Sequence, residues 1–130
     1  MRTLQPAGWP RPKGYSNGIA ASGRLIVTAG VIGWNEREEI VSDDLAGQFR
    51  QVLHNILAIL AEDGARPEHI VRMTWYVTDL DAYRSSLAEI GAAYRELIGL
   101  NFPAMAVVGV AGLVEPRAKI EIEATAVVPE

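Results

Sequence analysis

Two stretches of regular alternation limit the fold of this chain more than any other feature. In residues 71–78 apolar side chains alternate with more polar ones, and in residues 119–126 they alternate with mostly charged ones. Successive side chains of a strand point to opposite faces, so each stretch predicts a strand with one buried face. The chain must therefore build a sheet that other elements cover on one side.

The first helix that could provide this cover spans about residues 45–60. Its apolar side chains recur at the spacing of one helical face, and Gly64 follows as a typical end signal. We expect the Ser42 hydroxyl to cap this helix, with the carboxylates of Asp43 and Asp44 in its positive first turn.

A second helix is predicted between Asp79 and Gly99, and a strongly apolar strand follows at 104–110. The residues of this helix that we expect to be buried are Tyr83, Leu87, Ile90, Tyr94, Leu97 and Ile98. Residues 104–110 have almost nothing polar to show to water, so we expect a subunit interface there.

The beginning of the chain predicts two further strands, at 15–21 and 25–29. Ser22 and Gly23 stand between them, which suits a hairpin turn. The order of elements is then β-β-α-β-α-β-β, with both helices on one face of a mixed sheet, which is an α+β architecture. We expect one domain, 1–130, in which residues 1–14 form an extended N-terminal arm.

Composition argues against several classes of partner. The net charge is −4 and the 12 basic residues are scattered, whereas nucleic-acid binders need a basic face, so we expect no nucleic-acid partner. The longest uncharged stretch, 97–114, is shorter than the roughly 20 apolar residues of a membrane span. With no cysteine and no signal-peptide pattern at the start, we expect a cytoplasmic protein without a membrane partner.

Familiar motifs for metals and nucleotides are also missing. His54 and His69 have no partner at metal-ligand spacing, so no metal site is expected. The sequence contains no P-loop, no G-x-G-x-x-G and no G-x-S-x-G, which leaves nucleotide binding and serine-hydrolase chemistry without support.

Four stretches resemble, in order, the landmarks of the Rid family, also called the YjgF or L-PSP family. They are 48–55 in the first helix, 71–80 in the central strand, Phe102-Pro103-Ala104, and 119–124 in the last strand. The resemblance implies a chorismate-mutase-like fold, a homotrimer, and small-molecule pockets between subunits. Well-known members are deaminases that hydrolyse reactive enamines and imines to keto acids and ammonia without a cofactor.

The chain departs from those deaminases at the substrate-binding positions. Met105 stands where they have an arginine for the substrate carboxylate, Val107 where they often have cysteine, and Val31 where they often have glutamine. A charge-assisted bidentate contact contributes about 1.5–3 kcal/mol, which methionine cannot supply. The resemblance therefore indicates a subgroup with an altered range of substrates.

The resemblance also assigns roles to three residues. Glu121 matches the glutamate that positions the attacking water, Tyr15 a pocket tyrosine, and Gly30 a glycine whose backbone approaches the ligand. Each has a structural alternative: a solvated strand glutamate, an aromatic residue at a strand edge, and a simple bulge. Hydrolysis of a C=N bond does need a group that orients water, so the first assignment is chemically sensible.

Three apolar residues, Met105, Val107 and Trp34, could line a pocket for an apolar or aromatic ligand, although core or interface positions are the ordinary alternative. Four cations could replace the missing arginine, with surface solvation as the alternative for each. They are Arg117, Lys119, Arg72 and Arg24.

Three functions remain open at this point. The first is an enamine/imine deaminase-like hydrolase acting on a small metabolite. The second is a non-catalytic, small-molecule-binding or regulatory trimer, which the loss of the arginine favours. The third is the nuclease activity that some family names suggest, against which the acidic composition and the lack of paired catalytic histidines argue.

Overall fold

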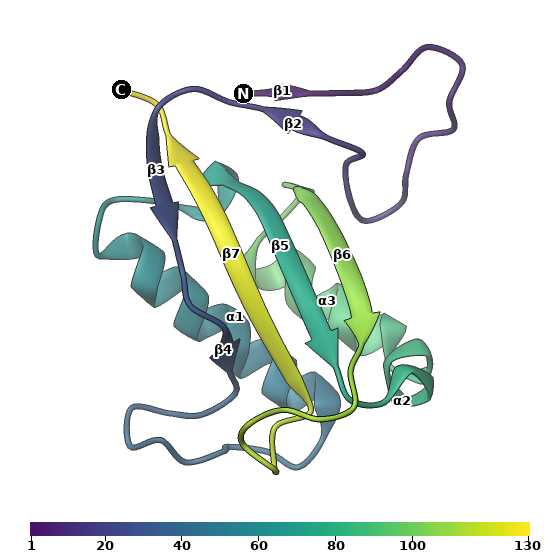
Figure 1. Ribbon diagram of the computed structural model, residues 1–130, viewed down its shortest axis with the longest axis vertical. Coiled ribbons are helices and arrows are strands. Elements are labelled where there is room, and N and C mark those ends of the chain that lie inside the picture. The colour runs from purple at the N-terminus through teal and green to yellow at the C-terminus, as the bar shows by residue number, and fades with distance from the viewer.

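The computed structural model covers residues 1–130 and contains a five-stranded mixed sheet with helices on one face (Figure 1). The strands of this sheet are β3 (Arg24–Val27), β4 (Val31–Ile32), β5 (Ile70–Val77), β6 (Ala104–Gly109) and β7 (Ile120–Val128). The helices are α1 (Leu45–Ala61), α2 (Leu80–Ser85) and α3 (Leu87–Leu97), with a 3-10 turn at Pro67–His69. The predicted α+β architecture is confirmed.

Strand β7 lies in the middle of the sheet and organises its pairing. It runs antiparallel to β5 on one side and to β3 and β4 on the other, while β5 and β6 are parallel. Thr28 joins β3 and β4 to the same neighbour, because its backbone N–H donates to Ala124 (2.9 Å) and its hydroxyl accepts from the Ala124 N–H (3.0 Å). The edge between these short strands therefore stays attached to β7.

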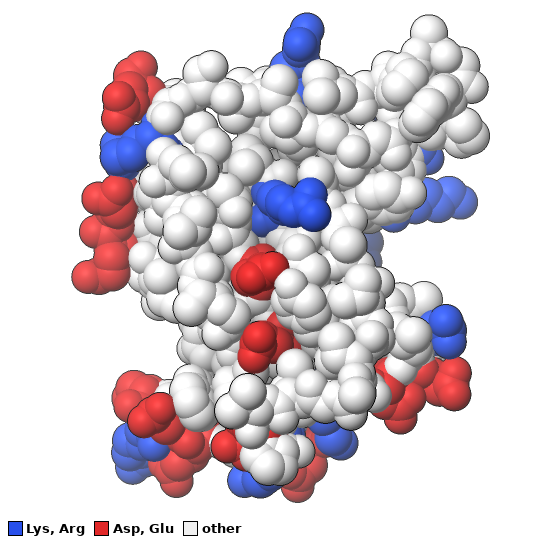
Figure 2. Space-filling model, in the orientation of Figure 1, with Lys and Arg blue, Asp and Glu red and all other residues white.

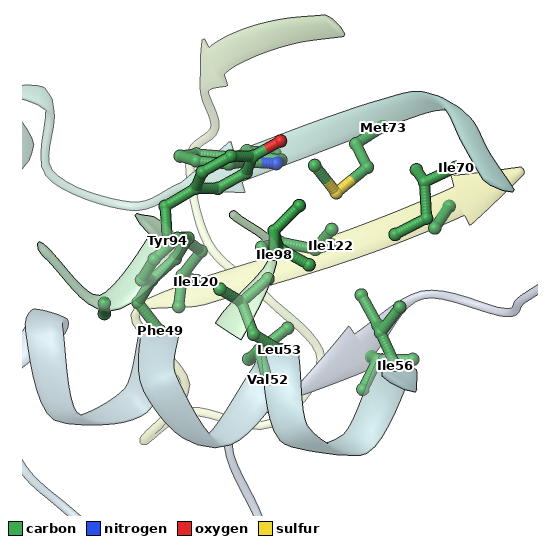
Figure 3. Close-up of a cluster of buried hydrophobic side chains, with 14 of the residues drawn as sticks. Phe49, Val52, Leu53, Ile56, Ile70, Met73, Tyr94, Ile98, Ile120 and Ile122 are labelled. Carbon is green, nitrogen blue, oxygen red and sulfur yellow. The ribbon is translucent and has the colours of Figure 1, made fainter. Parts of the chain in front are cut away.

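The alternating faces predicted for β5 and β7 are present. Met73, Trp75, Ile120 and Ile122 are buried beneath the helices, where they meet Phe49 and Leu53 of α1 (Figure 3). Burial of these apolar side chains stabilises the layer of helices on the sheet by roughly 1.5–3 kcal/mol for each large side chain. The opposite face carries no helix (Figure 1).

Two polar side chains of α1 bind the surrounding loops to the helix. Gln48 is fully buried, and its amide donates to the carbonyls of Ser42 (2.9 Å) and Arg117 (3.0 Å) and accepts from Lys119 N–H (2.7 Å). About two turns further on, Asn55 donates to the carbonyl oxygens of Ile32 and Trp34. Buried polar groups need such partners, so these contacts set where β4 and β7 begin relative to α1.

The predicted hairpin around Ser22 and Gly23 is wrong. Strand β2 (Ile19–Ala20) pairs with β1 (Arg2–Thr3), while β3 pairs with β7. The turn residues are present, but Gly23 packs against the backbone of Val128, where a side chain would collide. The N-terminal arm thus folds back on its own chain (Figure 1).

Both helix predictions need a correction in detail. The cap of α1 is Asp44, whose carboxylate accepts from Gly47 N–H, and Ser42 supports it by donating to that carboxylate (2.7 Å). Both hydrogen bonds lower the pKa of Asp44, and the one from Ser42 has the larger effect. The second predicted helix is broken at Ser86 into α2 and α3, and Leu87 just after the break is 53% exposed instead of buried.

The face of the sheet opposite the helices is open in the single chain. Leu25, Val27 and Val108 are exposed apolar residues of its strands. Figure 2, in the same orientation as Figure 1, shows this face as mostly uncharged, with acidic and basic groups near its centre. Such a surface suits burial against another molecule.

Candidate functional site

Glu121 and Gly30 are brought into direct contact on the β4–β7 side of the sheet. Ile32 of β4 pairs with Glu121, and Gly30 lies just before β4. A Cβ atom added to Gly30 would lie 2.4 Å from Oε2 of Glu121, so the carboxylate rests against the glycine backbone. The absence of a side chain at position 30 is what makes room for this carboxylate.

A second glutamate of β7 has a different partner. Tyr76 of β5 is opposite Glu121 in the register, yet its hydroxyl donates to Oε1 of Glu123 (2.7 Å). This hydrogen bond is the main reason that the pKa of Tyr76 is raised. Glu123 is therefore engaged by tyrosine, whereas the chain offers no hydrogen-bonding side chain to the carboxylate of Glu121.

An apolar cavity of about 500 Å³ lies elsewhere, between strand β6 and helices α2 and α3. Ten of its 14 lining residues are hydrophobic. Tyr15, Met105 and Val107 are among them, while Glu121, Gly30 and Trp34 are not. We call this space the aromatic cavity, because the rings of Trp75, Tyr83, Tyr94 and Phe102 form much of its wall.

The rings of the aromatic cavity support one another. Trp75 lies 4.8 Å from Phe49, 6.2 Å from Tyr94 and 6.4 Å from Tyr83 between ring centroids, within the range of favourable aromatic pairs. Tyr94 also donates its hydroxyl to the carbonyl of Asn101 (2.5 Å), which ties α3 to the segment before β6. Burial raises the pKa values of both Tyr83 and Tyr94, so these phenols stay neutral at physiological pH.

Tyr15 reaches the aromatic cavity because the residue after it is attached to β6. The N–H of Ser16 donates to the carbonyl of Pro103 (3.0 Å), and its hydroxyl donates to the carbonyl of Phe102. Ser16 and Ala104 form an isolated parallel bridge, which extends the sheet by one residue pair. The Tyr15 side chain, 43% exposed, therefore stands at the mouth of the cavity.

The charged residues of the aromatic cavity were missed by the sequence reasoning. They are Lys13 and Arg95, both exposed, and neither forms an ion pair within the chain. Arg95 lies ten residues before Met105, closer in sequence than Arg117 at twelve, so proximity could have pointed to Arg95, whereas no local signal marks Lys13. Only the packing of the arm and α3 around β6 brings them to this position.

The cations proposed from the sequence lie outside the aromatic cavity. Arg117 pairs with Asp43 (2.9 Å) and Arg24 with Asp63 (2.8 Å). Lys119 is an exposed residue at the start of β7, and Arg72 is exposed on the open face of the sheet. None of the four replaces an arginine at position 105 within one chain.

The residues expected to form one site occupy opposite faces of the sheet. In the register of β5 and β6, Met105 pairs with Met73 and Val107 with Trp75, so both point toward the helices. Glu121 alternates with the buried Ile120 and Ile122 and points to the open face. Val31 also points inward, into the core, and Trp34 lies just after β4, outside the aromatic cavity.

Two further observations concern the whole chain. The side chains of His, Cys, Asp and Glu form no group of three or more that could hold a metal ion. None of the helices combines the length and the apolar character that crossing a lipid bilayer requires.

Comparison with known proteins gives a consistent result. A family model described as Endoribonuclease L-PSP matches residues 10–128. A RutC family protein of Aquifex aeolicus is 34% identical over 128 residues, which cover 98% of this chain and 99% of the relative. The 2-iminobutanoate/2-iminopropanoate deaminase of Escherichia coli is 39% identical over 105 residues, covering 81% and 80% of the two chains.

The solved structures agree with the sequence relatives. A conserved Rid family protein of Yersinia pestis superposes with a TM-score of 0.86 at 34% identity, covering 98% of both chains. The match of the L-PSP family model to nearly the whole sequence, together with these relatives, shows that the chain belongs to the L-PSP or Rid family.

Proposed function

We propose that this protein is an enamine/imine deaminase that hydrolyses a small reactive metabolite and releases ammonia. The observation that carries the proposal is the carboxylate of Glu121, which lies against the bare backbone of Gly30 with no side chain hydrogen-bonded to it. A carboxylate in that state can accept a proton from a water molecule. The Escherichia coli relative is named for an imine deaminase activity of the same kind.

The reaction needs only groups that the chain supplies. An enamine first tautomerises to the imine. Glu121 then accepts a proton from water as the water oxygen bonds to the imine carbon, and it passes this proton to the imine nitrogen. The hydroxyl proton of the resulting carbinolamine is transferred to the nitrogen as the C–N bond breaks, so that ammonia departs and a carbonyl remains. Backbone groups near Gly30 and Val107 would polarise the reacting nitrogen or the new carbonyl.

The aromatic cavity would bind the rest of the substrate. Tyr15, at its mouth, would donate its hydroxyl to the substrate or to water, and Met105 and Val107 would contact its apolar part. Because Met105 offers no charge to a carboxylate, we expect a substrate range that differs from that of members with arginine.

The positions of these groups favour a site made by two copies of the chain. Glu121 and the aromatic cavity belong to opposite faces of one sheet, so a substrate in the cavity cannot touch the Glu121 of the same chain without a large rearrangement. The open, largely apolar face would be buried against a neighbour in a cyclic homotrimer. Glu121 of one subunit would then face the cavity of the next.

The experiment compares two glutamates of the same strand. Ammonia release from freshly generated 2-aminoacrylate and related imines is measured for the wild type, Glu121→Gln and Glu123→Gln. We expect Glu121→Gln to lower kcat/KM by about 10²–10⁴-fold, the usual effect of losing a general acid or base. Glu123→Gln loses the same charge two residues away and should retain activity within about threefold.

The deaminase proposal fails if the folded wild-type protein does not accelerate ammonia release from a broad set of imines. It also fails in its assignment of Glu121 if the two variants are equally active. Size-exclusion chromatography with light scattering is needed beside each assay, so that a lost assembly is not mistaken for lost chemistry.

A second candidate is a non-catalytic, ligand-binding trimer. The observation in its favour is that the charged residues lining the cavity of a single chain are two cations, with no acid that could activate water. A ligand that raises the melting temperature and is recovered unchanged, together with inactivity toward every imine, would support this function instead.

A further inference from the structure

The aromatic cavity is built for a larger and more specific ligand than a three-carbon imino acid. At about 500 Å³ it lies within the range of pockets that enclose whole ring-containing ligands. Its floor is Trp75, only 4% exposed, and its sides include Tyr83 and Phe102. Tyr83 and Phe102 are only half-buried, so a ligand that reached only the mouth would leave their apolar surfaces in contact with water.

The two cations of the cavity have no partner of their own. None of the salt bridges in the chain includes Lys13 or Arg95. The Arg50–Glu96 pair shows that a carboxylate beside Arg95 in sequence is taken by another residue. Lys13 and Arg95 therefore present two uncompensated positive charges to whatever fills the cavity.

A contact with Gly91 shows the direction of the Arg95 side chain. A Cβ atom on Gly91, one turn earlier in α3 and itself part of the cavity wall, would lie 3.9 Å from a guanidinium nitrogen of Arg95. The side chain thus folds back along the helix toward the cavity. Since Gly91 has no side chain, the guanidinium can lie close to the wall.

We propose that the cavity selects 2-imino acids that carry an aromatic or large apolar side chain. The ring would pack against the half-buried Tyr83 and Phe102, and the carboxylate would pair with Arg95 and Lys13 instead of with an arginine at position 105. This inference rests on the proposed function, because it names the substrate class of the same site. In such a ligand the carboxylate matches the two positive charges of the cavity wall, and the ring matches its apolar surface.

The test measures binding without turnover, so that it stays separate from the deaminase assay. Phenylpyruvate and pyruvate, unreactive 2-oxo acids, are titrated into the wild type by calorimetry. We expect phenylpyruvate to bind at least about tenfold more tightly, because only its ring can bury apolar wall. Equal affinity for the two acids, or no binding of phenylpyruvate, overturns the proposal.

Charge variants then locate the carboxylate. Arg95→Gln should weaken phenylpyruvate binding by about tenfold, the low end for a charge-assisted hydrogen bond, and Lys13→Gln by less. Arg95→Lys should restore part of the loss. The matched control is Arg37→Gln, which removes an exposed arginine paired with Glu39 outside the cavity and should change nothing. If Arg95→Gln and Arg37→Gln behave alike, Arg95 does not hold the ligand.

The two proposals fail in distinguishable ways. Binding of an unreactive 2-oxo acid requires no activation of water by Glu121, so phenylpyruvate affinity and imine hydrolysis are two separate readouts. Tight phenylpyruvate binding with no imine hydrolysis would refute the deaminase and leave the ligand class standing. Hydrolysis of small imines with no preference for the ring would refute the ligand class alone.

Discussion

The contact between Glu121 and Gly30 and the aromatic cavity are built in different ways. The first depends on strand register: β4 and β7 pair so that a carboxylate meets a glycine backbone. The second depends on side-chain packing, with four rings and the N-terminal arm gathered around β6. Backbone pairing gives an arrangement that tolerates few changes, whereas a packed wall can change its shape by single substitutions. Chemistry and selectivity can therefore be altered independently in this protein.

The largest effect should come from a methyl group at Gly30. Gly30→Ala places a Cβ where Oε2 of Glu121 lies, 2.4 Å away, and the flexible carboxylate must move. We expect deaminase activity to fall about 100-fold, the loss that a misplacement on the order of 1 Å can cause. Stability to urea should hardly change, because the displaced atom is the end of a partly exposed, flexible side chain.

Gly33→Ala is the matched control for that prediction. Its Cβ would lie 2.9 Å from the backbone carbonyl of Gln48, so helix α1 and the segment after β4 must separate. We expect a loss of about 1–3 kcal/mol in the free energy of unfolding, the usual cost of overpacking. If Gly30→Ala destabilises the fold as much as Gly33→Ala, the contact with Glu121 is structural.

A change in the cavity wall should act on affinity instead. Met105→Arg restores a cation to the strand that lines the aromatic cavity, and it should raise the affinity for pyruvate by about 10–100-fold. Calorimetric titration measures the gain. No gain in a variant whose oligomeric state is unchanged would mean that residue 105 does not face the ligand.

A smaller effect, on stability, is expected from the hydrogen bond between Tyr94 of the cavity wall and the backbone of Asn101. Tyr94→Phe removes the hydrogen bond to Asn101 and should cost about 1 kcal/mol of unfolding free energy at pH 7. Burial raises the pKa of Tyr94, so the neutral phenol stabilises the fold fully below its unfolded pKa of about 10 and that contribution is lost as the pH rises. The difference between wild type and variant should therefore shrink in urea titrations above pH 10. A constant difference would contradict this origin.

The sequence predicted the faces of the sheet well. Alternation in β5 and β7 is a local property, and it correctly put Ile120 and Ile122 inside and Glu121 outside. The direction in which Met105 and Val107 point was not predictable in the same way. It follows from the parallel register of β5 and β6, which joins residues far apart in the chain.

The errors share a physical cause. Ser22 and Gly23 form a suitable turn, but β1 and β7 compete successfully for the strands on either side. Arg117 and Arg24 were candidates to replace the missing arginine, yet Asp43 and Asp63 hold them. In each case a contact between distant segments decided the outcome, and a single sequence does not reveal such contacts.

The central proposal is that Glu121 of one copy completes the cavity of another, and subunit mixing tests it most directly. Glu121→Gln and Tyr15→Ala are each assayed for imine hydrolysis and then co-expressed in equal amounts, with mixed oligomers verified by mass spectrometry. If each site takes Glu121 from one copy and Tyr15 from another, about one site in four of a randomly mixed ring combines a native Glu121 with a native Tyr15. Activity should then recover to about a quarter of wild type. If both act within one chain, no mixed site contains both, and activity no higher than the mean of the two parents would contradict the proposal.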